Sequence, residues 1–115
     1  MAQKGRPRKK KIIHEQPRID LFSPGGRPGR PEEVVVAIEE YEAIRLHDYL
    51  RMSQKTAAQM MGISQQSFSR IVREARRKVA DAIVNAKIIR IEGGDFVNKR
   101  SMELAKRLRR RTPPA

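Results

Sequence analysis

The middle of the chain carries apolar residues at helical spacing. The first such stretch contains Ile38, Tyr41, Ile44, Leu46 and Leu50. Their recurrence at about 3.6 residues predicts a helix. Glutamates in the first turn of this stretch would complement the positive end of the helix dipole, which favours the same interpretation.

Two further helices are predicted on either side of a glycine. Ser53 is suited to cap a helix over residues 54–61, because its hydroxyl can accept a hydrogen bond from an unpaired backbone amide. Gly62 can adopt the left-handed conformation that ends many helices. Ser64 is a second N-cap, for a helix over about residues 65–87.

The third predicted helix has two distinct faces. Its apolar stripe, which we expect to face the core, is formed by Phe68, Ile71, Val72, Ala75, Val79 and Ile83. Its opposite face is formed by Gln66, Ser69, Arg70, Arg73 and Arg77. Most charged helix faces are only solvated, but short polar side chains beside a run of positive charge favour a binding face here.

The segments outside these helices predict little regular structure. Residues 1–31 are rich in glycine and proline, which disfavour a helix, although Ile12–Ile13 and Leu21–Phe22 indicate that parts of this arm lie against the core. Val34–Val36 predicts a short extended piece. We therefore predict an all-α fold, with a three-helix core that lacks a wing. Its parts are a basic, mostly irregular arm (1–31), a helical domain (32–96) and a basic extension (97–115).

Composition adds an expected class of partner to this outline. The 115 residues suffice for one domain and carry a net charge of +13. The charge is uneven, since residues 31–50 have a net charge of −5, whereas residues 1–30, 51–94 and 95–115 have +7, +6 and +5. This distribution favours a polyanionic partner, with nucleic acid first and an anionic membrane surface second.

Several other classes are disfavoured. The chain has no cysteine and two histidines, which excludes disulfides and closed zinc sites of the usual ligand types. No stretch approaches the ~20 consecutive apolar residues of a membrane span. The sequence offers no nucleophile–histidine–acid set and no glycine-rich phosphate loop, so we expect neither enzyme activity nor a cofactor. We expect a cytoplasmic, nucleoid-associated protein with no membrane partner.

Helix, glycine turn and helix together outline a helix-turn-helix, whose second helix lies in the DNA major groove. That motif also needs a small residue within its first helix and apolar residues that fix the crossing of the two helices. The chain fills the required positions with Gln54, Ala58, Gly62, Phe68 and Ile71. The alternative is an unspecialised helical hairpin.

Two resemblances rest on these motifs. Residues 53–79, with Met61-Gly62-Ile63-Ser64 at their centre, resemble the DNA-binding helix-turn-helix in region four of the primary sigma factors. Arg6-Pro7-Arg8-Lys9, residues 41–46, residues 61–68 and Arg90-Ile91-Glu92-Gly93-Gly94-Asp95 are similar to a prokaryotic family of small, largely uncharacterised, predicted DNA-binding proteins. The second resemblance implies a family domain over residues 6–96 and sequence-specific duplex binding in transcription control.

Roles in such binding follow from side-chain chemistry. Arginine matches guanine and glutamine matches adenine in the major groove. We expect base or near-base contacts from Gln65, Gln66, Ser69, Arg70 and Arg73. Phosphate contacts, which set the register on the duplex, are expected from Gln54, Thr56, Ser64, Arg77 and Lys78. Phe68 is expected in the core and not as a stacking aromatic.

The beginning of the arm has its own candidate chemistry. Residues 4–10 are similar to an AT-hook, in which Arg6 and Arg8 would enter the narrow minor groove of A·T-rich DNA. The alternative is an arm that acts by charge alone.

Partners other than double-stranded DNA are also expected. A core of about 60 residues is marginal by itself, and one helix-turn-helix buries only roughly 600–1,000 Å² on DNA, so we expect a homodimer on a two-fold site. The acidic first helix could contact RNA polymerase or neutralise a neighbour's arm. The competing function is an RNA-binding or architectural protein that acts through its basic tails, which is weakened by the small number of aromatic residues available for stacking.

Overall fold

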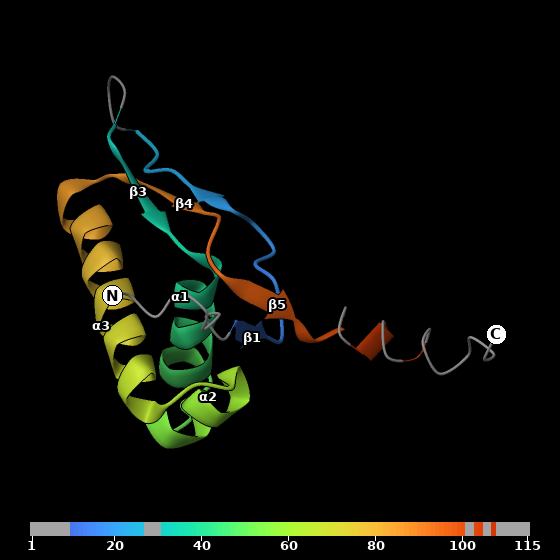
Figure 1. Cartoon of the computed structure of the whole chain (residues 1–115). Coiled ribbons are helices and arrows are strands. Elements are labelled where there is room, and N and C mark those ends of the chain that lie inside the picture. Colours follow the sequence, from blue (N-terminus) through green and yellow to red (C-terminus); the bar gives the residue numbers. More distant parts are fainter. Residues whose placement is uncertain (1–9, 27–30, 101–102, 105–106, 108–115) are drawn as a thin grey trace, which may run out of the picture.

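A computed structural model describes residues 10–26, 31–100, 103–104 and 107 of the chain. Among these residues, three strands precede the helices along the chain, and two strands follow them. In chain order they are β1 (Lys11–Ile13), β2 (Leu21–Phe22), β3 (Glu33–Val36), α1 (Ile38–Ala43), the π-helical η1 (Ile44–Tyr49), α2 (Gln54–Met61), α3 (Gln65–Asn85), β4 (Ile88–Ile91) and β5 (Phe96–Asn98). Figure 1 shows their arrangement, with α2 at one end of α3 and strands β3 and β4 towards the other.

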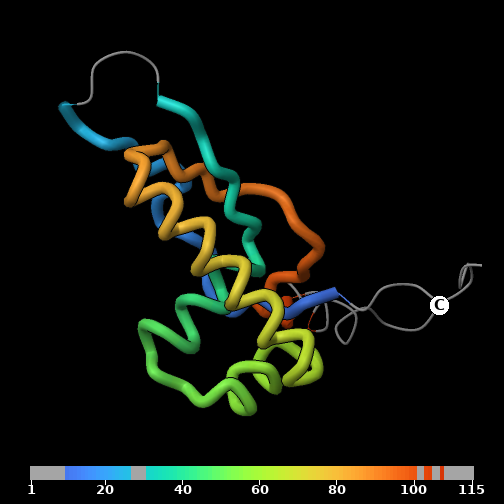
Figure 2. The backbone as a smooth tube through the Cα atoms, turned by 90° about the vertical axis from the view of Figure 1, so that its left-hand side faces the viewer, coloured from blue at the N-terminus to red at the C-terminus, as the bar shows by residue number. Residues whose placement is uncertain are grey.

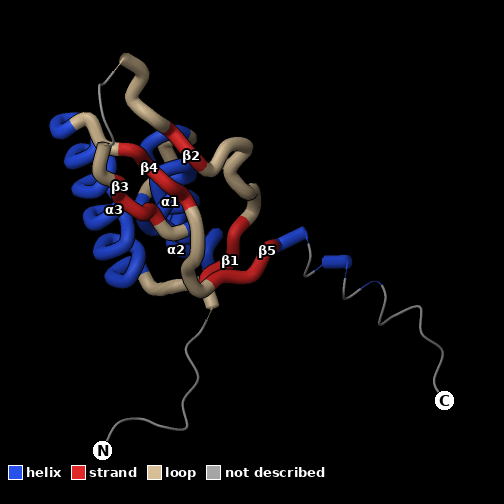
Figure 3. The backbone as a smooth tube through the Cα atoms, turned by 90° about the horizontal axis from the view of Figure 1, so that it is seen from above, coloured by secondary structure: helices blue, strands red, loops and turns tan. Residues whose placement is uncertain are grey.

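Two small sheets accompany the helices, so the all-α prediction is wrong and the fold mixes α and β structure. One sheet has the order β2-β4-β3, with β3 parallel and β2 antiparallel to β4. The other is a parallel pair of β1 and β5, in which Ile12 lies opposite Val97. The arm and the segment after α3 therefore contain strands (Figure 3). Their runs of β-branched residues pair only with segments far away in sequence, which a reading of local periodicity does not detect.

The second and third predicted helices are confirmed, together with their caps. The Ser53 hydroxyl accepts a hydrogen bond from the Thr56 amide at 3.0 Å, and Ser64 does the same for Ser67. Gly62 ends α2 in the left-handed region, at φ 69°. The first predicted helix is present as α1, followed without a break by the wider turn of η1.

The predicted core stripe of α3 is correct at one end and wrong at the other. Phe68, Val72 and Ala75 are buried, whereas Ile83 is 72% exposed and Ala82 is buried in its place. The N-terminal half of α3 packs on α1 and α2, while its C-terminal half lies beside β3 and β4 (Figure 2). The short sheet covers only the side of the helix that carries Ala82, so the apolar stripe ends before Ile83.

A buried carboxylate joins the N-terminal arm to α1. Glu42 is fully buried, and its two oxygens accept hydrogen bonds from Arg45 Nε at 2.8 Å and Arg45 Nη2 at 3.1 Å. One of them also accepts from the backbone amide of His14 at 2.9 Å, directly after β1. Arg45 reaches outward to Glu15 at 2.9 Å. The hydrogen bond between Glu42 and His14 fixes β1 against the helices, and β1 in turn pairs with β5.

Both histidines have structural contacts. His14 Nε2 donates to the carbonyl of Met60 at 2.8 Å, and His47 Nδ1 donates to the carbonyl of Met52 at 2.7 Å. The ring of His47 also lies edge-on to that of Phe68. Among the helices that the structure describes, none is long and apolar enough to cross a membrane.

We predict that Glu42→Ala destabilises the fold by about 3–5 kcal/mol, because it removes the buried partner of the mostly buried Arg45 guanidinium and of the His14 amide. Glu15→Ala is the matched control. It removes the exposed carboxylate from the same arginine and should cost less than about 1 kcal/mol. Urea unfolding followed by circular dichroism measures both, and equal losses would contradict the role assigned to Glu42.

Candidate nucleic-acid interface

The three residues between α2 and α3 set the angle at which these helices meet. The left-handed Gly62 directs its amide to the carbonyls of Ala58 and Gln59, and the Ile63 amide donates to Ala58 at 3.0 Å. Ala58 and Phe68 are buried where the helices pack together. At Gly62 the position of a Cβ would lie 3.1 Å from Ile12 Cδ1, so strand β1 also packs closely against the turn.

The N-terminal half of α3 presents a polar face to solvent. Gln65, Gln66, Arg70 and Arg73 are exposed, and Ser69 is half-buried. The sequence predicted base contacts at these five residues, and the structure brings them together on one face at the beginning of α3.

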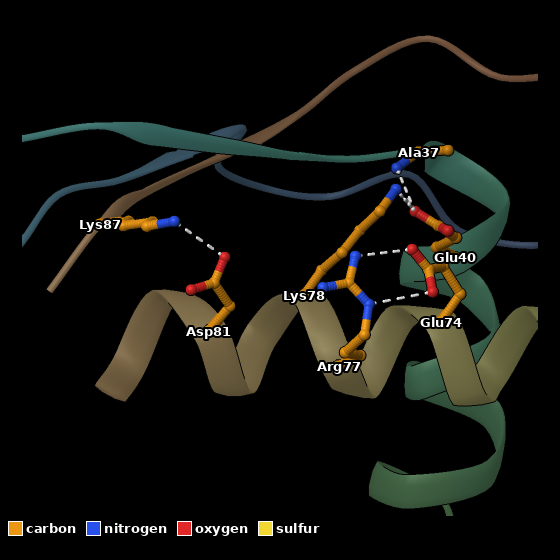
Figure 4. A network of polar contacts seen from close by, with 7 residues as sticks. All are labelled: Ala37, Glu40, Glu74, Arg77, Lys78, Asp81 and Lys87. Carbon is orange, nitrogen blue, oxygen red and sulfur yellow. Dashed lines mark hydrogen bonds and ion pairs between the residues drawn. The ribbon is translucent and has the colours of Figure 1, made fainter. Parts of the chain in front are cut away.

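The arginines and lysine on α3 separate into two groups. Arg70 and Arg73 make no ion pair with any described residue, whereas Arg77 binds Glu74 through two hydrogen bonds of 3.1 and 2.8 Å. Lys78 binds Glu40 of α1 at 2.8 Å (Figure 4). Unpaired positive charge on this helix is therefore concentrated at its first half.

The lysine contact is part of the packing between α1 and α3. The Glu40 oxygen that accepts from Lys78 also accepts from the Ala37 amide at 2.9 Å, which caps the start of α1. Lys78, assigned to a phosphate from its position in the sequence, is half-buried in this contact.

Arg76 has a comparable structural contact with η1. Its guanidinium holds both carboxylate oxygens of Asp48, at 2.6 and 3.1 Å. Hydrogen bonding by Arg76 lowers the pKa of Asp48, and hydrogen bonding by Arg77 likewise lowers the pKa of Glu74. Both carboxylates thus stay ionised at neutral pH and neutralise their arginines.

A shallow groove runs beside the first half of α3. It has a volume of about 570 Å³, and its polar lining consists of Lys11, Glu40, Ser64, Ser67, Arg70 and Glu74. Lys11 belongs to β1, so the described part of the arm begins next to the polar face of α3. Arg6 and Arg8, the residues of the predicted AT-hook, lie outside the described residues.

The other predicted phosphate contacts lie at helix starts. Thr56 is exposed on the first turn of α2, and Gln54 is half-buried beside it. The Ser64 hydroxyl is committed to its cap, where it accepts from the Ser67 amide and donates to the Ser67 hydroxyl. Sequence reasoning missed Lys55, which is exposed on α2, and Lys11 on β1, whose place in the groove beside α3 depends on the folded arrangement.

The acidic first helix is not an acidic surface. Glu39 accepts from the Asp95 amide at 3.2 Å, while Glu40 and Glu42 are buried in the contacts described above. These carboxylates stabilise the fold, which gives no support to a polymerase contact through α1. Within the described ranges there is no cluster of residues suited to hold a metal ion.

We predict that Gly62→Ala destabilises the protein by about 1–2 kcal/mol, because a Cβ is strained at φ 69° and would press on Ile12. Gly25→Ala is the control, since its Cβ would meet no atom within 4 Å and its φ is unexceptional. Thermal unfolding of the two variants checks this. Equal melting temperatures would show that the turn tolerates a side chain.

The profile of the family described as "Protein of unknown function DUF134" matches residues 1–99. A UPF0251 protein of Methanococcus maripaludis is 47% identical over 94 residues, which cover 81% of this chain and 72% of that protein. A UPF0251 protein of Caldicellulosiruptor bescii is 49% identical over 92 residues, or 80% of this chain and 64% of that protein. No solved structure matches the chain.

Proposed function

The chain belongs to the family of proteins of unknown function DUF134, and from this premise we propose that it binds double-stranded DNA in a sequence-specific manner, through α3. The observation that carries the proposal is the pair Arg70 and Arg73. They are the α3 arginines that make no ion pair with a described residue, and they lie on the exposed first half of the helix.

The geometry suits insertion of α3 into a major groove. In proteins that use a helix-turn-helix, the N-terminal part of the second helix contacts base edges while the first helix crosses the backbone. Here α2 and α3 meet at a three-residue turn, and the first two turns of α3 after it carry Gln65, Gln66 and Ser69. Arginine and glutamine side chains can each make paired hydrogen bonds to a guanine or an adenine.

Phosphate contacts would flank the base contacts on both sides. Lys55 and Thr56 are exposed on the first turn of α2, and Lys11 lines the same groove as Arg70. We assign Lys55, Thr56 and Lys11 to phosphates. Arg77 would join them only after releasing Glu74, and Lys78 is retained in the contact with α1.

This arrangement supports a role in transcription regulation, in line with the resemblance of residues 53–79 to region four of sigma factors. The alternative function, RNA binding or architectural binding through basic tails, rests on the net charges of +7 in residues 1–30 and +5 in residues 95–115. The two functions differ in whether the side chains of α3 choose the sequence that is bound.

Selection from a random pool of duplex DNA at about 0.2 M salt tests the proposal, because this salt concentration suppresses nonspecific binding. An enriched motif supports it. Recovery of bound DNA without a motif would overturn sequence-specific binding and favour the architectural alternative.

We predict that Arg70→Ala and Arg73→Ala each weaken binding to the selected site by about 1–3 kcal/mol and each relax one base position. Arg76→Ala is the control on the same helix, since its guanidinium is held by Asp48. It should leave the selected motif unchanged. Fluorescence anisotropy on a panel of single-base variants measures these effects, and an equal loss from all three substitutions would contradict the assignment.

We predict that Glu74→Gln strengthens DNA binding and makes the negative slope of log K against log salt steeper by about 0.9, because it releases Arg77 to one more phosphate. Glu92→Gln removes a negative charge from an exposed loop residue and serves as the control. Titrations at several salt concentrations compare the two. The same slope for both variants would show that Arg77 does not reach the DNA.

A further inference from the structure

Large apolar side chains are exposed around Phe22 of strand β2. Phe22 itself is 51% exposed, and Ile83, on the C-terminal half of α3, is 72% exposed. We call this area the Phe22 surface, and its exposed apolar members are Ile19, Phe22, Tyr49, Leu50 and Ile83. They come from the arm, the end of η1 and α3, which are far apart in the sequence.

Three hollows show that this surface is continuous. The largest, about 520 Å³, is lined on its apolar side by Ile19, Phe22, Tyr49 and Leu50. A second, of about 290 Å³, lies between Phe22 and Ile83. A third, of about 210 Å³, has a wholly apolar lining that includes Phe22 and Val79. Phe22 of strand β2 lines all three hollows, so they adjoin one another at this residue.

Charge around these hollows is balanced once the acids that pair with their cations are counted, although the whole chain carries +13. Their charged lining residues are Glu15, Arg18, Arg45 and Lys87. Arg45 pairs with Glu15 and Glu42, and Lys87 pairs with Asp81. A second positive chain could therefore approach here with less repulsion than elsewhere, and Arg18 of each copy could meet Glu15 of the other across a two-fold axis.

The position of this surface on α3 also fits a two-fold arrangement on DNA. Ile83 lies 13 residues beyond Arg70, or about 20 Å along the helix at 1.5 Å per residue. A two-fold axis beside Ile83 would place the two Arg70 side chains up to about 40 Å apart. Half-sites one helical turn apart require about 34–36 Å. This step rests on the proposed function, whereas the apolar exposure and the charge balance do not.

We propose that the Phe22 surface is the interface at which two copies of this chain form a symmetric dimer. Each copy inserts its Phe22 and Ile83 into the hollows of the other. Apolar contact of this kind stabilises association by removing exposed apolar area from water, and a two-fold contact uses the same residues on both copies.

Light scattering coupled to gel filtration of the full-length protein tests this at micromolar concentration. We expect twice the chain mass of 13.2 kDa for the native protein and one chain mass for Phe22→Glu and for Ile83→Glu. Ile83 is a solvent-exposed helix position, so this second variant keeps its fold even where Phe22→Glu disturbs β2. Circular dichroism checks both.

Val35→Glu is the matched control. Val35 is 46% exposed on a strand of the same sheet, close to the exposure of Phe22, and lines none of the three hollows. It should leave the dimer intact. A native protein of one chain mass would overturn the proposal, as would a dimer that survives Ile83→Glu or is lost equally in Val35→Glu.

DNA binding separates this proposal from the proposed function. On a duplex with one half-site of the selected motif, Phe22→Glu and Ile83→Glu should bind like the native protein, whereas on the complete two-fold site they should lose at least tenfold in affinity. A native protein that dimerises but does not bind DNA would contradict only the proposed function. A native protein that binds the complete site as one chain would contradict only the dimer.

Discussion

The buried carboxylate of Glu42 is the constraint on which the rest of the arrangement depends. An ionised group without exposure to water must be fully paired, and Glu42 takes its partners from two segments, the side chain of Arg45 and the backbone of His14. This contact holds β1 against the helices, and β1 then pairs with β5 and presses Ile12 on the turn at Gly62. The described part of an arm rich in glycine and proline thereby belongs to the folded domain, and its Lys11 lies beside the polar face of α3.

The same principle, that a paired charge is committed to structure, divides the cations of α3. Arg76 and Lys78 connect this helix to η1 and α1, and Arg77 is neutralised by Glu74 one turn away. Arg70 and Arg73 are exposed and make no ion pair with a described residue, so their charges face solvent. The long helix consequently has separate ends, a polar end next to α2 for which we propose DNA contact and an apolar end beside the sheet for which we propose contact with a second copy (Figure 1).

Local features of the fold were predictable because the interactions behind them are local. Ser53, Gly62 and Ser64 act within three or four residues of their own positions, so the bounds of α2 and the start of α3 follow from the sequence. Phe68 and Val72 repeat at helical spacing and are buried as predicted. The side of α3 on which Gln66, Arg70 and Arg73 lie follows from the same periodicity.

By itself, then, the sequence determined the helices, their caps and the polar face of α3, because each depends on neighbours along the chain. Only the tertiary structure decided the sheets, since Val34 pairs with Ile89 and Leu21 with Arg90 across long separations that no local pattern encodes. It likewise decided which cations are paired: the acids that hold Arg76 and Lys78 lie on other elements, and they meet these residues only when the chain is folded. The exposure of Ile83 has the same origin, because a periodic stripe shows which residues share a face but not how far the neighbouring sheet extends over it.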